Sequence, residues 1–372
     1  MKEMKGVSWS RRRLLGTLPA LSALSIWVPG ASARGTVPER DAAIHPGEAS
    51  NTVNGPGATT MQRRKRLVLA GPPASVSNPL IHLVESGALA DVAEHVEFVQ
   101  WSNPDQLRAL AMGGDADFIA VPTNVAANLY NRGVPLTLIN VSVWGALWMV
   151  SRNNALHTLA DFKGQEIAIP FRADMPDILF GFLSEKQGLD LRKDFKLRYT
   201  STPMDAIQLL VMHQVDHALL AEPAVSMVLR KTQSFPLSIA APTLYRSVNL
   251  QDEWARVLQR EPRIPQAGIA ALGAVRQDAA LMAHVEQAYA ASNTWCAEHP
   301  VECGKMVARH IPMLMPEAVA DSICSIPRDY ETATQARPEL DYFYGVLFER
   351  EPAVIGGKMP DAGFYGDHAV QR

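Results

Sequence analysis

Residues 104–122 read PDQLRALAMGGDADFIAVP, and residues 203–223 read PMDAIQLLVMHQVDHALLAEP. Both stretches begin with proline and aspartate, continue with apolar residues at matching positions, and end with an aspartate, an apolar run and a proline. The offset is 100 residues from Asp105 to Asp205 and stays between 99 and 101 throughout. The copy extends upstream, because the strand-like Leu67–Ala70 lies 100 residues before Ile167–Pro170. Two related α/β units predict two lobes that face each other across a cleft. Chance similarity remains the alternative, since every α/β unit obeys the same patterning.

Each copy predicts the same order of elements. In the first lobe we expect strands over 66–70, 95–101 and 118–121, with helices over 78–87 and 104–112. In the second we expect strands over 166–170, 196–200 and 215–221, with helices over 174–187 and 203–213. Asn103 and Thr202 are the expected N-caps of the second helix in each lobe. Short links between strands and helices predict parallel βαβ units and an α/β fold.

The end of the chain predicts a return to the first lobe after Pro242. Residues 266–273 are apolar and small, which suits a strand, and helices are expected over 278–296, 301–309 and 316–324. The domain boundaries that follow are 66–148 plus 243–372 for the first lobe and 149–242 for the second.

The N-terminus is typical of an export signal. Arg11, Arg12 and Arg13 precede an apolar stretch that ends at Val28, and small residues at 31–33 offer a cleavage site. Paired arginines before a modest apolar core resemble a twin-arginine signal, with an ordinary secretory signal as the alternative. Residues 34–65 contain few large apolar side chains and predict a flexible leader. No cysteine follows the cleavage site before Cys296, so we expect a periplasmic protein without a lipid anchor.

Charge and motifs exclude several classes of function. The first 33 residues carry five basic side chains and one acid, so the remaining chain has a net charge of −7, against −3 for the whole. Such an acidic chain has no electrostatic footprint for nucleic acid. No phosphate-binding loop, nucleophile elbow or zinc-protease motif occurs in the sequence. We therefore expect a monomer without enzymatic activity, cofactor or metal. Cys296 and Cys303 are either a disulfide or two packed thiols.

Ligands of parallel sheets bind beyond the carboxyl ends of the strands. This rule nominates five loops: 72–78, 102–105, 122–124, 171–174 and 222–224. Ser75 and Ser77 precede a helix, where free amides favour an anion, and Arg172 could add a bidentate contact or remain solvated. Trp101 and Trp144 could form apolar walls or belong to the core. Glu222 could meet a ligand amine or cap the following helix.

Three segments resemble the nitrate/sulfonate/taurine-type solute-binding proteins of ABC importers, a group that includes thiamine-precursor binders. Residues 159–168, LADFKGQEIA, are similar to the segment that begins the second lobe of these proteins. Residues 112–118, MGGDADF, resemble their G-x-x-D-F segment, and residues 216–223 resemble their V-D-A and E/D-P segment. The resemblance covers residues 66–310.

The resemblance implies a type II periplasmic-binding-protein fold with a ligand trapped between two lobes. Crossovers would lie near 145–152 and 238–245, and the partners would be a small organic solute and a permease with a cytosolic ATPase. The implied solute is anionic or zwitterionic, sulfonate- or pyrimidine-like, and hinge closure would capture it. By position, the implied ligand contacts are Ser75, Ser77, Thr123, Asn124, Trp144, Gly145, Arg172, Asp174 and Glu222. Trp101 is a further candidate, as a possible apolar wall of the site.

The sequence departs from the group in two places. The second-lobe loop reads Phe171-Arg172-Ala173-Asp174 instead of a small glycine-serine turn, and His213-Gln214 replaces a glycine before Asp216. The cysteine-rich motif of the thiamine-precursor synthases with this fold is missing. Arg172 favours an anion, whereas Phe171 and Asp174 weaken the transfer of any one ligand. An enzyme on the same fold and a binding protein for a sensor kinase remain the alternatives.

Overall fold

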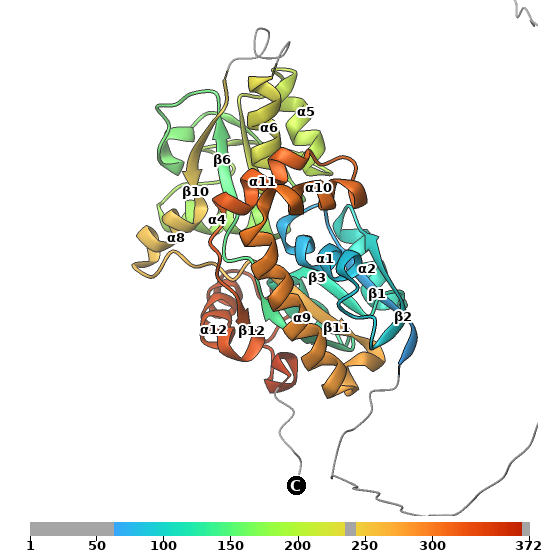
Figure 1. The fold of residues 1–372 in the computed structure, drawn as a ribbon. Helices are drawn as coiled ribbons and strands as arrows, with labels where there is room; N and C mark the ends of the chain where they lie inside the picture. The colour runs from blue at the N-terminus through green and yellow to red at the C-terminus, as the bar shows by residue number, and fades with distance from the viewer. Residues whose placement is uncertain (1–62, 235–242, 367–372) are drawn as a thin grey trace, which may run out of the picture. The chain divides into compact units, whose positions relative to one another are not determined.

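The computed structural model describes residues 63–234 and 243–366, and two five-stranded sheets lie within these ranges (Figure 1). The expected export signal and nearly all of the leader lie outside the described residues. The first strand, β1, begins at Arg64, just inside the expected leader. Among the described residues, no helix is both long and apolar enough to span a bilayer.

The first sheet has the strand order β2-β1-β3-β11-β4. Strand β1 is parallel to its neighbours β2 and β3, whereas β11 is antiparallel to β3 and β4. The bounds are Arg64–Gly71 for β1, Ala93–Gln100 for β2, Phe118–Pro122 for β3, Leu136–Leu138 for β4 and Ala267–Leu272 for β11. Residues Leu67–Ala70 are buried on both faces of this sheet, which explains their continuous apolar run.

The second sheet has the order β10-β6-β9-β7-β8. Strand β7 is parallel to β8 and β9, whereas β6 is antiparallel to β9 and β10. The bounds are Leu147–Ser151 for β6, Glu166–Pro170 for β7, Lys196–Thr200 for β8, His217–Ala221 for β9 and Tyr245–Asn249 for β10.

The two sheets confirm the duplication predicted from the sequence. The order β2-β1-β3 in one sheet corresponds to β8-β7-β9 in the other, with the same parallel pairing. The register corresponds too, because Arg66 pairs with His95 and Glu166 pairs with Lys196. Strands β3 and β9 each have an antiparallel neighbour on the other side, β11 and β6.

Four helices follow the strands as predicted: α1 (Asn78–Ser86) and α2 (Pro104–Gly113) in the first unit, and α4 (Met175–Lys186) and α5 (Pro203–Val211) in the second. Three further helices were not predicted: α3 (Thr123–Asn131) in the first unit, and α6 (Ala224–Gln233) and α8 (Leu250–Leu258) in the second. The side chain of Asn103 accepts hydrogen bonds from the backbone N–H groups of Asp105 and Gln106. Thr202 and Asp205 form a reciprocal capping box at the start of α5. Both N-caps are therefore confirmed.

Short elements complete the fold. Strands β5 (Asn140–Val141) and β12 (Glu331–Thr332) form a small antiparallel pair. Single 3₁₀ turns lie at Ser75–Ser77 (η1), Leu159–Phe162 (η2), Gly273–Gln277 (η3), Pro352–Ile355 (η4) and Ala362–Tyr365 (η5).

The predicted lobe boundaries are wrong at the second crossover. The chain returns to the first sheet only at β11, after residues 259–266, and not near residue 243. Strand β10 pairs with β6, and Trp254 of α8 packs 5.8 Å from Phe182 of α4, measured between ring centroids. The segment 245–258 therefore belongs with the second sheet. Sequence reasoning missed it because five residues of mixed polarity in β10 carry little periodicity.

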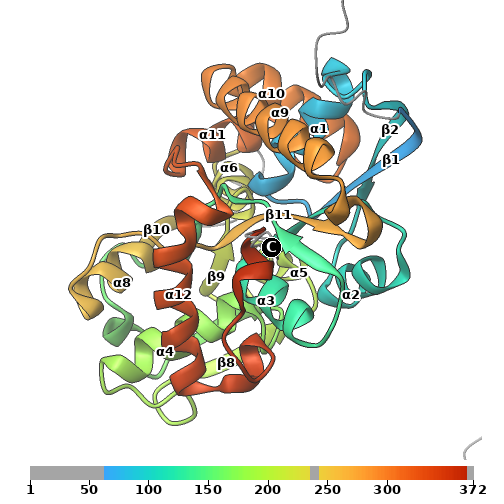
Figure 2. The same cartoon turned by 90° about the horizontal axis from the view of Figure 1, so that it is seen from below.

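The C-terminal helices contact both units. Helices α9 (Ala279–Glu298), α10 (Pro300–His310) and α11 (Pro316–Ser325) follow β11, and α12 (Ala333–Arg350) follows β12 (Figure 2). Asp321 of α11 pairs with Arg230 of α6, and Glu185 of α4 pairs with Arg350 of α12 at 2.7 Å. These helices form the expected C-terminal extension and link the second unit to the first.

Candidate functional site

A cavity of about 140 Å³ lies where the loops of the two units meet. It is lined by all five loops that the strand-end rule nominated, together with the beginning of β11. The lining residues are Pro72, Pro73, Ala74, Val76, Trp101, Ser102, Pro104, Leu107, Val121, Pro122, Val125, Phe171, Asp174, Met175, Pro176, Pro203, Ala221, Glu222, Ala224, Gln266 and Ala267. We call this space the interlobe cavity. Most of its wall is apolar.

Three of the predicted contact residues line the interlobe cavity: Trp101, Asp174 and Glu222. Trp101 directly follows β2, Asp174 is the N-cap of α4, and Glu222 follows β9. Loops from both units therefore bring an indole and two carboxyl groups to one small space.

The structure places four other predicted residues in the framework around the cavity. Ser77 is buried, and its hydroxyl donates to the carbonyl of Pro72 at 2.6 Å. The hydroxyl of Thr123 donates to the carbonyl of Pro265 at 2.5 Å. Trp144 is buried below the guanidinium of Arg263, which lies 4.0 Å from its ring centroid, and Gly145 adjoins the side chain of Gln251. The indole of Trp144 therefore belongs to the core.

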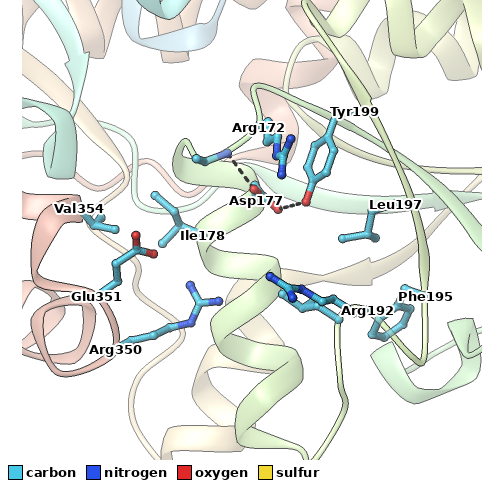
Figure 3. A pocket seen from close by; sticks show the side chains of 12 residues that line it. Arg172, Asp177, Ile178, Arg192, Phe195, Leu197, Tyr199, Arg350, Glu351 and Val354 are labelled. Atoms are coloured by element: carbon cyan, nitrogen blue, oxygen red, sulfur yellow. Dashed lines mark hydrogen bonds between the residues drawn. The ribbon is translucent and has the colours of Figure 1, made fainter.

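Three further residues lie in neighbouring pockets. Ser75 lines a small pocket against α9, and Asn124 lines a groove that also contains Arg108 and Asp174. Arg172 is exposed and lies over the ring of Tyr199, 5.3 Å from its centroid, in an outer pocket of about 660 Å³ (Figure 3). The cation that favoured an anionic ligand therefore points away from the interlobe cavity.

The loop after β7 explains why Arg172 faces outward. Phe171 and Ala173 both have left-handed backbone angles, with φ of 62° and 59°. Such angles cost non-glycine residues on the order of 1–2 kcal/mol, so the surrounding structure must hold them. The N–H of Ala173 donates to Asp177 at 2.8 Å, which fixes the turn. Phe171 and Asp174 thereby line the interlobe cavity, and Arg172 lines the outer pocket.

Asp174 is a buried acid with a weakly bound counter-ion. One carboxylate oxygen accepts from the N–H of Met175 at 2.8 Å, and the other lies 3.8 Å from Arg108 of α2. Burial raises the pKa of Asp174, and the Met175 hydrogen bond and the charge of Arg108 partly oppose this effect. Arg108 belongs to the first unit, so this contact spans the two units.

Glu222 is fully paired in contrast. Its carboxylate accepts from Arg246 of β10 at 2.5 Å and from the backbone N–H of Ser226 at 3.0 Å. The second contact caps the first turn of α6, which is the structural alternative that the sequence left open. The carboxylate of Glu222 therefore already has a cation and an amide donor.

Sequence reasoning missed much of the apolar lining. Leu107 and Val125 are helix residues whose inward direction depends on how α2 and α3 pack. Gln266 directly precedes β11, an expected strand whose place beside the cavity depends on its pairing with β3. Phe171 carried a usable signal, because it directly follows the carboxyl end of β7.

No protein-family model matches this sequence, and no curated protein matches it significantly. Solved structures do match. An ABC transporter structure from Parabacteroides distasonis has a TM-score of 0.63 at 22% identity, over 81% of this chain and 98% of that one. The alkanesulfonate-binding protein SsuA from Xanthomonas axonopodis pv. citri, bound to MOPS, has a TM-score of 0.59 at 16% identity, over 79% and 95%.

The nitrate-binding protein NrtA from Synechocystis PCC 6803 has a TM-score of 0.56 at 16% identity, over 69% of each chain. At this level of identity the matches establish the architecture. The two related five-stranded sheets match the architecture of these structures, and this chain has the fold of the solute-binding proteins of ABC importers.

Proposed function

We propose that the protein is the exported solute-binding component of an ABC importer, acting as a monomer in the periplasm. The observation that carries this proposal is the interlobe cavity, which is lined by loops from both units at the carboxyl ends of their strands. The fold shared with sulfonate- and nitrate-binding proteins supports the same role. The membrane partner would be a permease with a cytosolic ATPase.

The cavity dimensions support a small organic solute. An apolar cavity of about 150 Å³ is known to hold one benzene molecule, so about 140 Å³ suits a single six-membered ring. Trp101, Phe171 and Leu107 supply apolar contacts for such a ring. Within the expected range of anionic, zwitterionic, sulfonate-like and pyrimidine-like solutes, this lining favours a pyrimidine-like ring.

Capture would proceed by hinge closure. A solute in the interlobe cavity contacts residues of both units, such as Trp101 and Met175, only when the two sets of loops approach. Differential contacts of this kind shift an open protein towards the closed state. The crossovers at residues 142–146 and 259–266 are the segments that must bend.

The test combines ligand-induced stabilisation with X-ray scattering. A panel of sulfonates, nitrate, pyrimidines and amines is screened by thermal unfolding against the wild type and an Ala74→Trp variant, whose indole would fill the cavity. Ala280→Trp, on the exposed surface of α9, is the matched control. We expect at least one solute to raise the Tm of the wild type and the control, and to lower their radius of gyration.

The Ala74→Trp variant should show neither response while retaining the wild-type circular dichroism spectrum. The proposal fails if no solute stabilises the wild type, or if Ala74→Trp responds as the wild type does.

A further inference from the structure

The charges around the interlobe cavity do not suit an anion. Among the residues that the structure describes, no lysine or arginine lines the cavity, whereas Asp174 and Glu222 both do. An anionic solute would have to lie near two carboxyl groups in a poorly solvated space, which is unfavourable. The structural neighbours named as sulfonate- and nitrate-binding proteins would suggest an anionic solute, whereas the charged residues of this cavity wall are acids.

The two acids differ in how well they are satisfied. Glu222 has a fully buried side chain with Arg246 at 2.5 Å and an amide donor at 3.0 Å. The side chain of Asp174 is 8% exposed, and within the described residues its one short hydrogen bond is the 2.8 Å contact from Met175. Arg108, at 3.8 Å, lies beyond hydrogen-bond distance and also faces Asp105 at 3.4 Å. Asp174 therefore retains acceptor capacity towards the cavity.

A second polar atom in the cavity wall is also unsatisfied. The indole Nε1–H of Trp101 is buried and finds no acceptor in the part of the chain that the structure describes. Buried donors of this kind normally have a partner. Two residues of the cavity wall thus have unused hydrogen-bonding capacity: Asp174 as an acceptor and Trp101 as a donor.

The helix cap alone does not explain the acid at position 174. Asp174 is the N-cap of α4, but Pro176 at the second helical position has no N–H to donate. Asparagine caps helices about as well as aspartate. The cap therefore requires a side-chain oxygen but not the negative charge of Asp174, whose nearest cation is Arg108 at 3.8 Å.

We propose that the solute carries a cationic or N–H-donating group that binds the carboxylate of Asp174, and an acceptor atom that binds Nε1 of Trp101. This inference rests on the proposed solute-binding role and specifies its chemistry. The chemical class is a single small ring with an amine or amidine group, and Arg108 is the internal cation that such a group would displace or outcompete.

The test uses three probes of similar size and different charge: benzylamine, benzyl alcohol and benzenesulfonate. Their dissociation constants are measured by calorimetry on the wild type and on Asp174→Asn, Asp252→Asn and Arg108→Ala. Asp174→Asn keeps the capping oxygen and removes the charge. Asp252→Asn is the matched control, because Asp252 is an exposed acid in the first turn of α8, another helix of the second unit.

We expect the wild type to bind benzylamine more tightly than the other two probes. Asp174→Asn should weaken benzylamine binding about ten-fold or more, as expected for the loss of a hydrogen bond to a charged group. Asp252→Asn should leave it unchanged. Arg108→Ala should leave it equal or tighten it, because a competing cation is removed.

Every other pattern overturns the inference. Tighter binding of benzenesulfonate, weakened by Arg108→Ala, would assign an anion to the cavity. Weaker benzylamine binding in both Asp174→Asn and Arg108→Ala would mean that the Asp174–Arg108 ion pair only holds the two units together and that Asp174 does not bind the solute. If none of the probes binds, or if Asp174→Asn has no effect, Asp174 is not the recognition group. Stabilisation by a solute of another class in the thermal screen would still support the solute-binding role, so the two failures are distinguishable.

Discussion

Gly145 shows how a single residue fixes the first crossover. It lies between β5 and β6 with φ of +99°, and a Cβ there would come within 2.1 Å of the side chain of Gln251. Other residues avoid such backbone angles, and the buried Gln251 has little space to move. The glycine predicted as a ligand contact thus has a demonstrable structural role.

We predict that Gly145→Ala destabilises the protein by roughly 1–3 kcal/mol, through backbone strain and overpacking together. The control is Gly133→Ala, at φ of +89° with open space around it, which carries strain without the clash. Urea unfolding of both variants separates the two contributions. Equal losses of stability would show that Gln251 does not restrict position 145.

Asp174 gives a prediction for the pH dependence of stability. Burial raises the pKa of this carboxyl in the folded protein, so the folded state holds the proton more strongly than the unfolded chain does. At a pH below the ordinary pKa of 3.8, Asp174 is protonated in both states and its burial costs no stability through ionisation. At a pH above the raised pKa of the folded state, the carboxyl is ionised in both states and the full loss of stability is present. Wild-type stability should therefore fall, relative to Asp174→Asn, as the pH rises through this window.

The measurement is the difference in unfolding free energy between the wild type and Asp174→Asn from pH 4 to pH 8. A difference that does not vary with pH would mean that Asp174 has the same proton affinity in the folded and unfolded states.

Helix α12 ties the C-terminal extension to the loop beside the interlobe cavity. The hydroxyl of Tyr344 donates to the carbonyl of Thr123 at 3.0 Å, and both residues are buried. Phe343, one residue earlier, packs 5.8 Å from Trp254 of α8, measured between ring centroids. One helix thus holds the first turn of α3 and a helix of the second unit.

We expect Tyr344→Phe to cost about 1–3 kcal/mol, because a buried carbonyl loses its donor. The matched control is Tyr342→Phe, which removes a hydroxyl from the same helix at a partly exposed site. Thermal unfolding should show a clearly larger loss for Tyr344→Phe. Equal effects would mean that water replaces the lost donor.

Elements with strong local signals could be predicted from the sequence. The bounds of β7 and β8 agree with the expected ranges, because a turn or cap residue limits each end. The location of β10 and of the second crossover could not be predicted, since strand pairing depends on residues about 95 positions apart, as between Arg246 and Val150. The outward direction of Arg172 depends on two left-handed residues that sequence rules do not anticipate.

At the scale of the whole molecule, the duplication builds the cavity and the differences between the copies determine its chemistry. Loops from corresponding strand ends of both units line the cavity, as the strand-end rule predicts for a ligand site. The two copies contribute different side chains to the cavity: the first unit contributes the indole of Trp101, and the second contributes the carboxyl groups of Asp174 and Glu222. An apolar space with one unsatisfied acid thus arises from two related halves.

The central claim is that a small solute occupies the interlobe cavity, and native mass spectrometry tests it most directly. The full chain is exported and gently purified in parallel with Ala74→Trp and Ala280→Trp. We predict that the wild type and Ala280→Trp retain a small organic molecule, seen as one discrete mass increment that disappears on denaturation, and that Ala74→Trp does not. An increment of the same mass on Ala74→Trp, or none on the wild type after incubation with every solute of the panel, would contradict the account.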